Sequence, residues 1–280
     1  MTTAIAIVNW NSGARLLTCI ESVLATSMDV EIVVVDNAST DDSMDLAAEL
    51  RARVKVISNS TNHGLATAMN QAFAATSTPY VLMLNPDVRA TAGALAHLER
   101  VMNGQPGAGA VGGYVNEKYL PRELPTMGRL VRENLGLAAR SNGRARGSDA
   151  YIVEQPAASA LLIRRAAYDE IGGFDDRFYP AWYEDVDFCK RLKTAGWQVY
   201  FAPKAEFFHE GGYGAKTLGA DAFHRAYYEN QLRYAKKHLG SAATLGVRLS
   251  IAAGMAGRMI IRPDQARTRW KTILGALGEW

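Results

Sequence analysis

The sequence predicts an α/β fold, with a mixed, mostly parallel sheet covered by helices on both faces and helices at the C-terminal end. Through the first hundred residues, short runs rich in Val and Ile alternate with amphipathic helical segments. These runs are apolar throughout rather than at every second residue, which is typical of parallel strands buried on both faces. From about residue 220 onward the pattern is helical only.

The elements follow from these patterns in chain order. The first four strands are expected at AIAIVNW, VEIVVVDNAS, VKVIS and YVLMLNPDV. The helices between them are expected at GARLLTCIESVLATS, DDSMDLAAELRAR and GLATAMNQAFAATS. Residues 154–178 predict a further strand and helix, and WQVYFAPKAEFFHEGG predicts strands after them.

The segment from residue 104 to 150 has the weakest pattern. It begins GQPGAGAVGGY and continues with seven Lys or Arg against three acidic residues between Lys118 and Asp149. Gly and Pro in such density are typical of a long loop. The loop is either a solvated excursion or a flap over a ligand, with arginines available for phosphates.

Composition and charge exclude several classes of protein. The 280 residues are 48% apolar and 21% charged, as in soluble globular proteins. A net charge of +3 without a dense basic run gives no reason to expect a nucleic-acid partner. Cys19 and Cys189 lack neighbouring cysteines, so neither a disulfide framework nor a zinc site is expected, and a cytoplasmic location fits.

Neither end of the sequence predicts a membrane span. The start, MTTAIAIVNWN, lacks a basic segment and is expected to be a strand rather than a signal peptide. The apolar stretch ATLGVRLSIAAGMAGRMII contains Arg248 and Arg258, so we expect it to be a poor transmembrane segment. Residues 241–280 carry six basic and two acidic residues. Such a basic helical end is either a solvated helix or one that lies on an anionic membrane surface.

Polar side chains follow each of the first four predicted strands. They are Asn9 and Asn11, Asp36 and Asn37, Asn59 and Asn62, and Asn85 and Asp87. Each pair alone is explained by turn and capping preferences. Because the carboxyl ends of parallel strands meet at one edge of a sheet, together they predict a polar ligand cleft. The sequence contains neither GxGxxG after the first strand nor GxxxxGK[ST], so dinucleotide and P-loop folds are not indicated.

An acidic cluster stands beside aromatic residues in FYPAWYEDVDFCKRL. Glu184, Asp185 and Asp187 follow Trp182 and Tyr183 directly. One interpretation is the first turn of a surface helix, where carboxylates meet the positive end of the macrodipole. The other is a carboxylate that holds its proton more readily beside rings and like charges, as a general base requires.

Seven motifs in fixed order carry a resemblance to a known family. They are VNWN, VVDNASTD, NHGLATAMN, LNPD, ASALLIRR, GGFDDRFYPAWYEDVDFCKRL and FFHEGG. This set resembles the family-2 inverting glycosyltransferases with a GT-A fold, and is most similar to their bacterial rhamnosyltransferase branch. The resemblance implies a GT-A domain over residues 1–235, with a nucleotide-binding half at 1–103 and an acceptor and catalytic half at 104–235. Residues 236–280 are then a C-terminal helical extension.

The resemblance implies a set of nucleotide contacts. Asp36 corresponds to the acidic residue that accepts the imide N–H of uracil or thymine. Asn9 lies where the family contacts the nucleotide. The remaining expected nucleotide contacts are Asn37, Asn62, Gly64 and Asn70.

The resemblance also implies a metal and a general base. The family's Asp-x-Asp corresponds to Asn85, Pro86 and Asp87, so an amide stands where the family has its first carboxylate. This amide is able to hydrogen-bond a ribose hydroxyl, but it offers a metal ion no negative charge. NPD alone is equally consistent with a turn. Asp87 and His209 are the expected ligands of a divalent cation, Mg²⁺ or Mn²⁺, although a single histidine at a strand end is often structural.

The general base implied by position in the acidic motif is Asp185. Trp182, Glu184 and Asp187 are then expected on the acceptor side. Neighbouring carboxylates and rings are expected to raise the pKa of Asp185.

The function implied is transfer of a sugar from a nucleotide diphosphate donor to a glycan or lipid-linked acceptor, with inversion. Within the rhamnosyltransferase branch this means L-rhamnose from dTDP-rhamnose, in bacterial cell-surface polysaccharide synthesis. Residue chemistry leaves open another dTDP- or UDP-linked sugar, such as galactofuranose, glucose or N-acetylglucosamine. Two other classes stay open: a non-catalytic nucleotide-sugar-binding module, and a membrane-surface module. The expected location is the cytoplasm, with peripheral contact at the inner face of the cell membrane.

Overall fold

The computed structural model describes residues 3–26, 30–137, 149–211, 213–261 and 263–279. These residues fall into two compact units. Unit 1 comprises Met1–Glu123, Ser141–Arg177 and Glu184–Tyr213, and unit 2 comprises Leu124–Arg140, Phe178–Tyr183 and Gly214–Trp280. The predicted boundary after residue 235 stays a prediction.

The first half of unit 1 is the parallel sheet that the sequence predicts. β1 (Thr3–Asn9) lies between β2 (Glu31–Asp36) and β4 (Tyr80–Leu84), and β3 (Val54–Ser58) pairs with the outer edge of β2. All three pairings are parallel. β1 is buried along its whole length, which explains why its sequence does not alternate.

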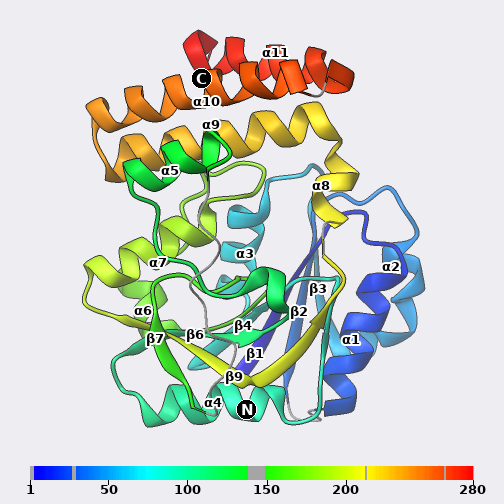
Figure 1. The fold of residues 1–280 in the computed structure, drawn as a ribbon. Helices are drawn as coiled ribbons and strands as arrows, with labels where there is room; N and C mark the ends of the chain where they lie inside the picture. The colour runs from blue at the N-terminus through cyan, green and yellow to red at the C-terminus, as the bar shows by residue number, and fades with distance from the viewer. Residues whose placement is uncertain (1–2, 27–29, 138–148, 212, 262, 280) are drawn as a thin grey trace. The chain divides into compact units, whose positions relative to one another are not determined.

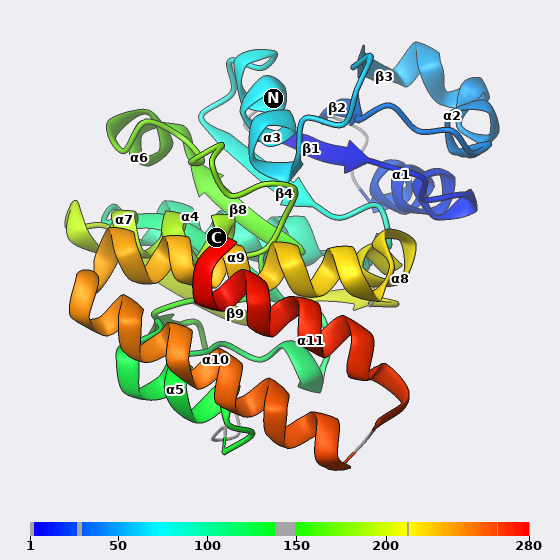
Figure 2. The same ribbon diagram turned by 90° about the horizontal axis from the view of Figure 1, so that it is seen from above.

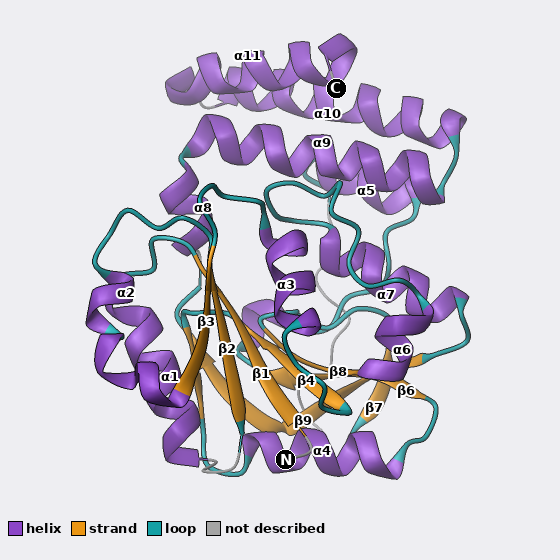
Figure 3. Cartoon of the chain, turned by 180° about the vertical axis from the view of Figure 1, so that it is seen from behind, coloured by secondary structure: helices purple, strands orange, loops and turns teal. Residues whose placement is uncertain are grey.

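The second half of unit 1 makes the sheet mixed. The strand order is β3-β2-β1-β4-β8-β6-β9-β5, with β7 (Tyr151–Val153) also paired to β9. β8 (Ala160–Arg164) runs antiparallel to β4 and to β6 (Ala108–Tyr114). β9 (Gln198–His209) is parallel to β6 and antiparallel to β5 (Val88–Ala90). The predicted mixed, mostly parallel sheet is therefore confirmed (Figure 3).

β6 corrects the expectation of a loop after residue 104. It contains the Gly-rich run GAVGG and lies inside the sheet, between β8 and β9. A Cβ at Gly112 would stand 2.4 Å from the Pro156 side chain, and one at Gly113 would stand 2.6 Å from that of Phe207. The glycines are therefore needed for close packing of a buried strand, and not for a turn.

Helices cover both faces of this sheet (Figure 1). The helices and short helical turns of unit 1 are α1 (Ala14–Thr26), α2 (Ser43–Leu46), η1 (Ala48–Arg53), α3 (Leu65–Ala74), α4 (Ala94–Gly104), η2 (Glu117–Tyr119), α6 (Arg165–Glu170) and α7 (Glu184–Thr194). α1 and α4 share one apolar core with Ile5 and Ile7 of β1. α3 packs on β1 and β2, and its buried residues Met69 and Phe73 lie outside that core. The predicted helix over DDSMDLAAELRAR is split into α2 and η1.

Unit 2 is a helical bundle. It contains α5 (Met127–Asn134), α9 (Ala220–His238), α10 (Ser241–Ile261), η3 (Pro263–Gln265), α11 (Ala266–Leu274) and η4 (Gly275–Glu279). α8 (Tyr213–Leu218) stands at the junction in sequence. α10 packs against α5, α9 and α11 (Figure 2). The predicted C-terminal helices are confirmed.

Two further expectations about this part of the chain need correction. α5 is a helix inside the segment expected to be a loop, and the arginines at 140, 144 and 146 of that predicted flap lie outside the described residues. α10 is long and apolar enough to cross a membrane, with a mean hydropathy of 1.3 over its best window, so the expectation of a poor span fails by length and composition. The same test is passed by core helices of soluble proteins.

Candidate functional site

The ends of β1 and β2 hold a buried polar cluster around Asp36. Asn9 and Asp36 are register partners on these parallel strands, so their side chains leave the sheet together. Asn9 Nδ2 donates to Asp36 Oδ1 at 2.8 Å, and Ser39 Oγ donates to the same oxygen at 2.6 Å. Both Asn9 and Asp36 are buried. The carboxylate is thus fixed in one orientation.

A cavity of about 470 Å³ opens beside this carboxylate. It is lined by Asp36, Ser39, Asp41, Met44, Asp45, Val56 and Ser58. Met44 and Val56 supply apolar surface for the face of a flat ring, and Asp36 supplies an acceptor for an N–H at its edge. Burial opposes ionisation of Asp41, but hydrogen bonds from Ser43 and from Gly13 N hold the pKa of its carboxyl below the ordinary value. This site therefore presents carboxylates and apolar walls in one cavity.

Asn37, Asn62 and Gly64 form a second cluster after β2 and β3. Asn37 Nδ2 donates to Asn62 Oδ1 at 3.0 Å and to the Gly64 carbonyl at 3.1 Å. Gly64 has φ 84°, which favours glycine, and its N–H donates to Asn62 Oδ1 at 2.8 Å. The cluster fixes the loop that starts α3.

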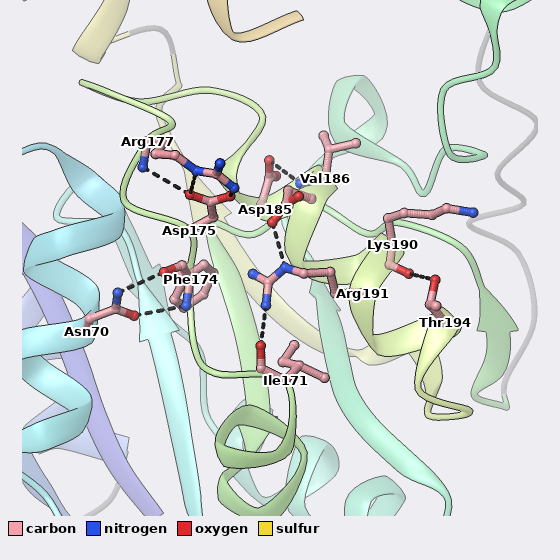
Figure 4. Close-up of polar contacts among 11 residues, drawn as sticks. Asn70, Ile171, Phe174, Asp175, Arg177, Asp185, Val186, Lys190, Arg191 and Thr194 are labelled. Carbon is pink, nitrogen blue, oxygen red and sulfur yellow. Dashed lines mark hydrogen bonds and ion pairs between the residues drawn. The ribbon is translucent and has the colours of Figure 1, made fainter. Parts of the chain in front are cut away.

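Asn70 connects α3 to the loop after α6 (Figure 4). Its Nδ2 donates to the Phe174 carbonyl, and its Oδ1 accepts from Phe174 N, each at 2.9 Å. Tyr168 Oη also donates to Asn70 Oδ1, at 2.7 Å. The side chain therefore holds the loop that leads toward the acidic cluster. Its predicted contact with the nucleotide stays a prediction.

Asp87 and His209 lie together, although 122 positions separate them in sequence. The pairing of β5 with β9 makes Val88 and His209 register partners, which brings His209 Nε2 to 3.3 Å from Asp87 Oδ2. Both side chains are buried, and the Tyr119 ring packs 4.9 Å from the imidazole ring. Asn85 lies at the end of β4, where its N–H donates to the Ser159 carbonyl at 3.0 Å.

The two side chains fit a hard divalent cation. Groups bound at about 2.1 Å to adjacent positions of an octahedral ion lie roughly 3 Å apart, close to the separation of Asp87 Oδ2 and His209 Nε2. Among the described residues, no group of three or more His, Cys, Asp or Glu is placed to hold a metal. An ion held here by two protein ligands would keep waters and substrate oxygens as its other ligands, as Mg²⁺ commonly does.

Asp185 lies in the first turn of α7. Val186 N donates to Asp185 Oδ1 at 2.8 Å, and Gln155 Nε2 donates to Oδ2 at 3.4 Å. Burial raises the pKa of the Asp185 carboxyl. The two hydrogen bonds and the nearby charge of Arg122 lower this pKa, but burial has the larger effect. The direction is the predicted one, but the main cause is burial rather than neighbouring carboxylates.

Gln155 and Arg122 are residues that sequence reasoning missed. Their backbones pair through two hydrogen bonds, Arg122 N to Gln155 O at 2.8 Å and Gln155 N to Arg122 O at 3.1 Å. This bridge brings both side chains toward Asp185. The bridge joins the segment expected to be a loop to the start of residues 154–178, and no local pattern marks this pairing.

Glu184 and Asp187 are buried on either side of Asp185 in the sequence. Burial, reinforced by the charge of Asp185, raises the pKa of Glu184 well above its ordinary value, and its Oε2 has no hydrogen-bond partner in the part of the chain that is described. Asp187 is paired with Arg191 at 2.7 Å, and Arg191 also donates to the Ile171 carbonyl (Figure 4). α7 thus begins with the acidic turn expected of a helix, but that turn is buried. Acceptor-side roles for both carboxylates stay predictions.

Trp182 belongs to unit 2 and has an unusual backbone. Trp182 and Tyr183 have φ of 73° and 72°, in the left-handed region that non-glycine residues rarely adopt. The Trp182 ring packs edge-on against Phe223 at 4.8 Å. Asn230 Nδ2 faces the carbonyls of Tyr179, Ala181 and Trp182 at 3.2, 2.9 and 3.1 Å. This amide holds the strained turn, and the acceptor-side role of Trp182 stays a prediction.

The chain is similar in sequence to a known family and to a characterised enzyme. A family model described as "Glycosyl transferase family 2" matches residues 4–172. The N-acetylglucosaminyl-diphospho-decaprenol L-rhamnosyltransferase of Mycobacterium tuberculosis (strain CDC 1551 / Oshkosh) is 27% identical over 303 aligned positions, which cover 95% of each chain.

Two solved structures resemble the whole chain. The mannosyltransferase PcManGT from Pyrobaculum calidifontis, in complex with GDP-Man and Mn²⁺, has a TM-score of 0.63 at 14% identity, covering 99% of this chain and 87% of its own. S. aureus TarS 1-349 has a TM-score of 0.59 at 14% identity, covering 99% of this chain and 80% of its own. At such identities the likeness shows the fold.

Proposed function

Because the chain belongs to glycosyl transferase family 2 and has the GT-A fold, we propose that it transfers L-rhamnose from dTDP-rhamnose to a lipid-linked glycan acceptor in bacterial cell-surface polysaccharide synthesis. The observation that carries the chemistry is Asp185, a buried carboxylate with a raised pKa at the start of α7. The rhamnosyltransferase aligned over 95% of this chain favours the sugar.

Asp185 acts as the general base in this proposal. Its carboxylate accepts the proton of the acceptor hydroxyl while that oxygen bonds to the anomeric carbon, and the bond from that carbon to the nucleoside diphosphate breaks on the opposite side. The single displacement inverts the anomeric configuration. A raised pKa strengthens the carboxylate as a base, and Gln155 orients the oxygen to which it donates.

The cavity beside Asp36 binds the nucleotide base. The fixed carboxylate accepts the imide N–H of thymine or uracil, while Met44 and Val56 lie along the ring. Cytosine and adenine lack an imide N–H, so this arrangement selects against them. Asn9 contributes to base binding indirectly, because its amide donates to Asp36 and holds that carboxylate in place.

Asp87 and His209 would hold a divalent cation, Mg²⁺ or Mn²⁺. When bound, the cation supplies positive charge that stabilises the departing diphosphate. Asn85, at the end of β4, offers an amide for a ribose hydroxyl in place of the family's first carboxylate.

Asn85 also motivates the competing function, a nucleotide-sugar-binding module without turnover. Loss of one acid weakens the expected charge at the metal site. Retention of Asp87, Asp185 and His209 in the arrangement described above supports catalysis instead. A different donor sugar on the same site is the second competitor, because sugar choice depends on pocket shape.

The experiment is nucleoside diphosphate release from dTDP-rhamnose and from UDP-linked galactofuranose, glucose and N-acetylglucosamine, with and without Mg²⁺ or Mn²⁺. We expect metal-dependent release from dTDP-rhamnose, reduced at least about a thousandfold in Asp185→Asn, which lacks the base. Nucleotide binding, measured by calorimetry, should change less than about threefold.

Asp169→Asn is the matched control, because Asp169 is an exposed aspartate of the same unit on α6. It should retain release. Release that is unchanged in Asp185→Asn would contradict the base assignment. Donor binding without release, when a diphosphate-lipid acceptor is also supplied, would favour the binding module.

A further inference from the structure

The two units carry opposite charge. Unit 2 contains 14 basic and 5 acidic residues, a formal charge of +9, whereas unit 1 contains 17 basic and 23 acidic residues, a charge of −6. The whole-chain value of +3 conceals this difference. A unit with so strong a positive charge is attracted to an anionic partner.

α10 presents an apolar stripe on the surface of this basic unit. Six of its exposed residues form this stripe, Ala242, Leu245, Leu249, Ala253, Ala256 and Ile260, while the exposed Ser241 and Ile261 at the two ends of the helix lie outside it. At 3.6 residues per turn these six positions fall within about 80° of the helix circumference. Leu245, Leu249 and Ile260 are 58%, 54% and 86% exposed. The opposite side, with Val247, Ile251 and Met255, is buried in the unit.

The cations of α10 do not interrupt this stripe. Arg248 Nη1 donates to the Ala276 carbonyl, and Arg258 Nη2 donates to the Glu133 carbonyl at 3.4 Å. Both arginines are directed to other parts of unit 2, so the exposed side of α10 is uncharged over its length. A surface helix that is apolar on both sides needs a partner for the exposed one.

α11 and its extension η4 add an exposed face of mixed character. Trp270, Leu274 and Leu277 are 53%, 44% and 52% exposed at a spacing of four and three residues. Arg267 and Lys271 are exposed on the same side of the helix, by helical spacing, and Lys271 also pairs with Asp221. Trp, Leu and basic residues on one helical face are the composition of helices that lie in the headgroup region of a bilayer.

We propose that unit 2 docks on the surface of an anionic phospholipid bilayer, with the α10 stripe and the exposed face of α11 as the contacting side chains. Two copies of a unit with charge +9 repel each other, which disfavours self-association. Nucleic acid matches the charge but not the leucine stripe. One side of α10 packs inside unit 2 and includes buried Ser250, so the helix lies along the surface rather than across the bilayer.

The experiment is co-sedimentation of the full chain with vesicles. One set contains phosphatidylcholine alone and the other also contains about a third phosphatidylglycerol, and both are tested at low and high salt. We expect binding to the anionic vesicles, weakened at high salt because lipid charge is then screened. The double substitution Leu245→Glu and Leu249→Glu should lower vesicle affinity at least about tenfold, since it removes two inserted side chains and adds repulsive charge.

Ile152→Glu is the matched control, because Ile152 is 57% exposed but lies on β7 of unit 1. It should bind vesicles as the unchanged chain does. Circular dichroism checks that all variants fold, and nucleoside diphosphate release in detergent should be equal in all of them, which separates docking from catalysis.

Three results would overturn the proposal. The first is equal binding to neutral and anionic vesicles. The second is binding that persists in high salt and alkaline carbonate, which would mean that α10 spans the bilayer. The third is that the unchanged chain binds no vesicle and forms a dimer, which the double substitution Leu245→Glu and Leu249→Glu dissociates.

Discussion

At the residue scale, the acidic motif is governed by burial. Glu184 and Asp185 are adjacent in sequence, and burial raises the pKa of both carboxyls. Glu184 Oε2 has no hydrogen-bond partner among the residues described, whereas Asp185 accepts from Val186 N and Gln155. The hydrogen bonds of Asp185 favour its carboxylate form and so oppose the effect of its burial.

Stability should therefore depend on pH through Glu184. An acid with a raised pKa in the folded state binds more protons when folded, so the free energy of unfolding falls as pH rises from the ordinary Glu value of 4.5 through the raised one. Glu184→Gln removes this titration, so the fall should become shallower. Denaturant unfolding between pH 5 and 8 measures both slopes.

The control is Glu206→Gln, since Glu206 is an exposed glutamate on β9. Its slope should match that of the unchanged chain. A slope in Glu184→Gln that equals that of the unchanged chain would show that Glu184 titrates in the folded state as it does in the unfolded chain.

At the scale of the element, α7 is anchored by one buried ion pair. Asp187 is fully buried and its partner Arg191 lies one turn later. Arg191→Leu leaves the carboxylate without its cation, and we expect a loss of about 3 kcal/mol or more in the free energy of unfolding. Lys193→Ala, on the same helix, removes an exposed pair with Glu154 and should cost less than about 1 kcal/mol. Similar losses in the two variants would contradict this account of α7.

α10 makes a second test at this scale, because two of its glycines have different surroundings. A Cβ at Gly254 would lie 1.9 Å from the Asn134 carbonyl oxygen of α5, whereas one at Gly257 would meet nothing within 4 Å. Gly254→Ala should therefore destabilise the protein by about 2 kcal/mol or more, since the contact is with backbone. Gly257→Ala should stabilise it by about 0.5 to 1 kcal/mol through helix propensity. Thermal unfolding of both variants decides, and a stabilised Gly254→Ala would refute close packing of α5 on α10.

The elements also show where sequence reasoning succeeds. β1, β2 and β4 were predictable because their runs are apolar throughout, and that property belongs to each strand alone. β6 was missed because its Gly content reflects neighbours from distant segments, Pro156 and Phe207, which no local pattern reveals. α5 was missed because it is only eight residues long, too short for a clear helical pattern.

At the scale of the whole molecule, part of the candidate site was predictable from the sequence and part was not. Sequence order predicted that the strand ends would meet, and Asn9 with Asp36, Asn37 with Asn62, and Asp87 with His209 do lie together. The first pair follows from the parallel register of β1 and β2, and the second joins the loops that follow the parallel neighbours β2 and β3. The third depends on the antiparallel pairing of β5 with β9, which only the motif order indicated. Gln155 was invisible because its contact with Asp185 arises from a bridge between loops.

The charge of the molecule was also hidden from whole-chain composition. A total of +3 gave no reason to expect a strongly basic unit, because the excess of acidic residues in unit 1 offsets most of the charge of unit 2. Residues 214–280 already carry 11 basic and 4 acidic residues, and the fold adds residues 124–140, with three basic residues and one acidic residue, to the same unit.

The two cysteines of the chain have a practical consequence. Cys19 and Cys189 are fully buried, and burial raises the pKa of both thiols, so neither forms the reactive thiolate readily. Maleimide reagents should leave the native protein unlabelled. A cysteine introduced at Leu249 would then react selectively, without prior removal of the native ones. A fluorophore attached there would allow the surroundings of α10 to be followed in the otherwise unaltered chain.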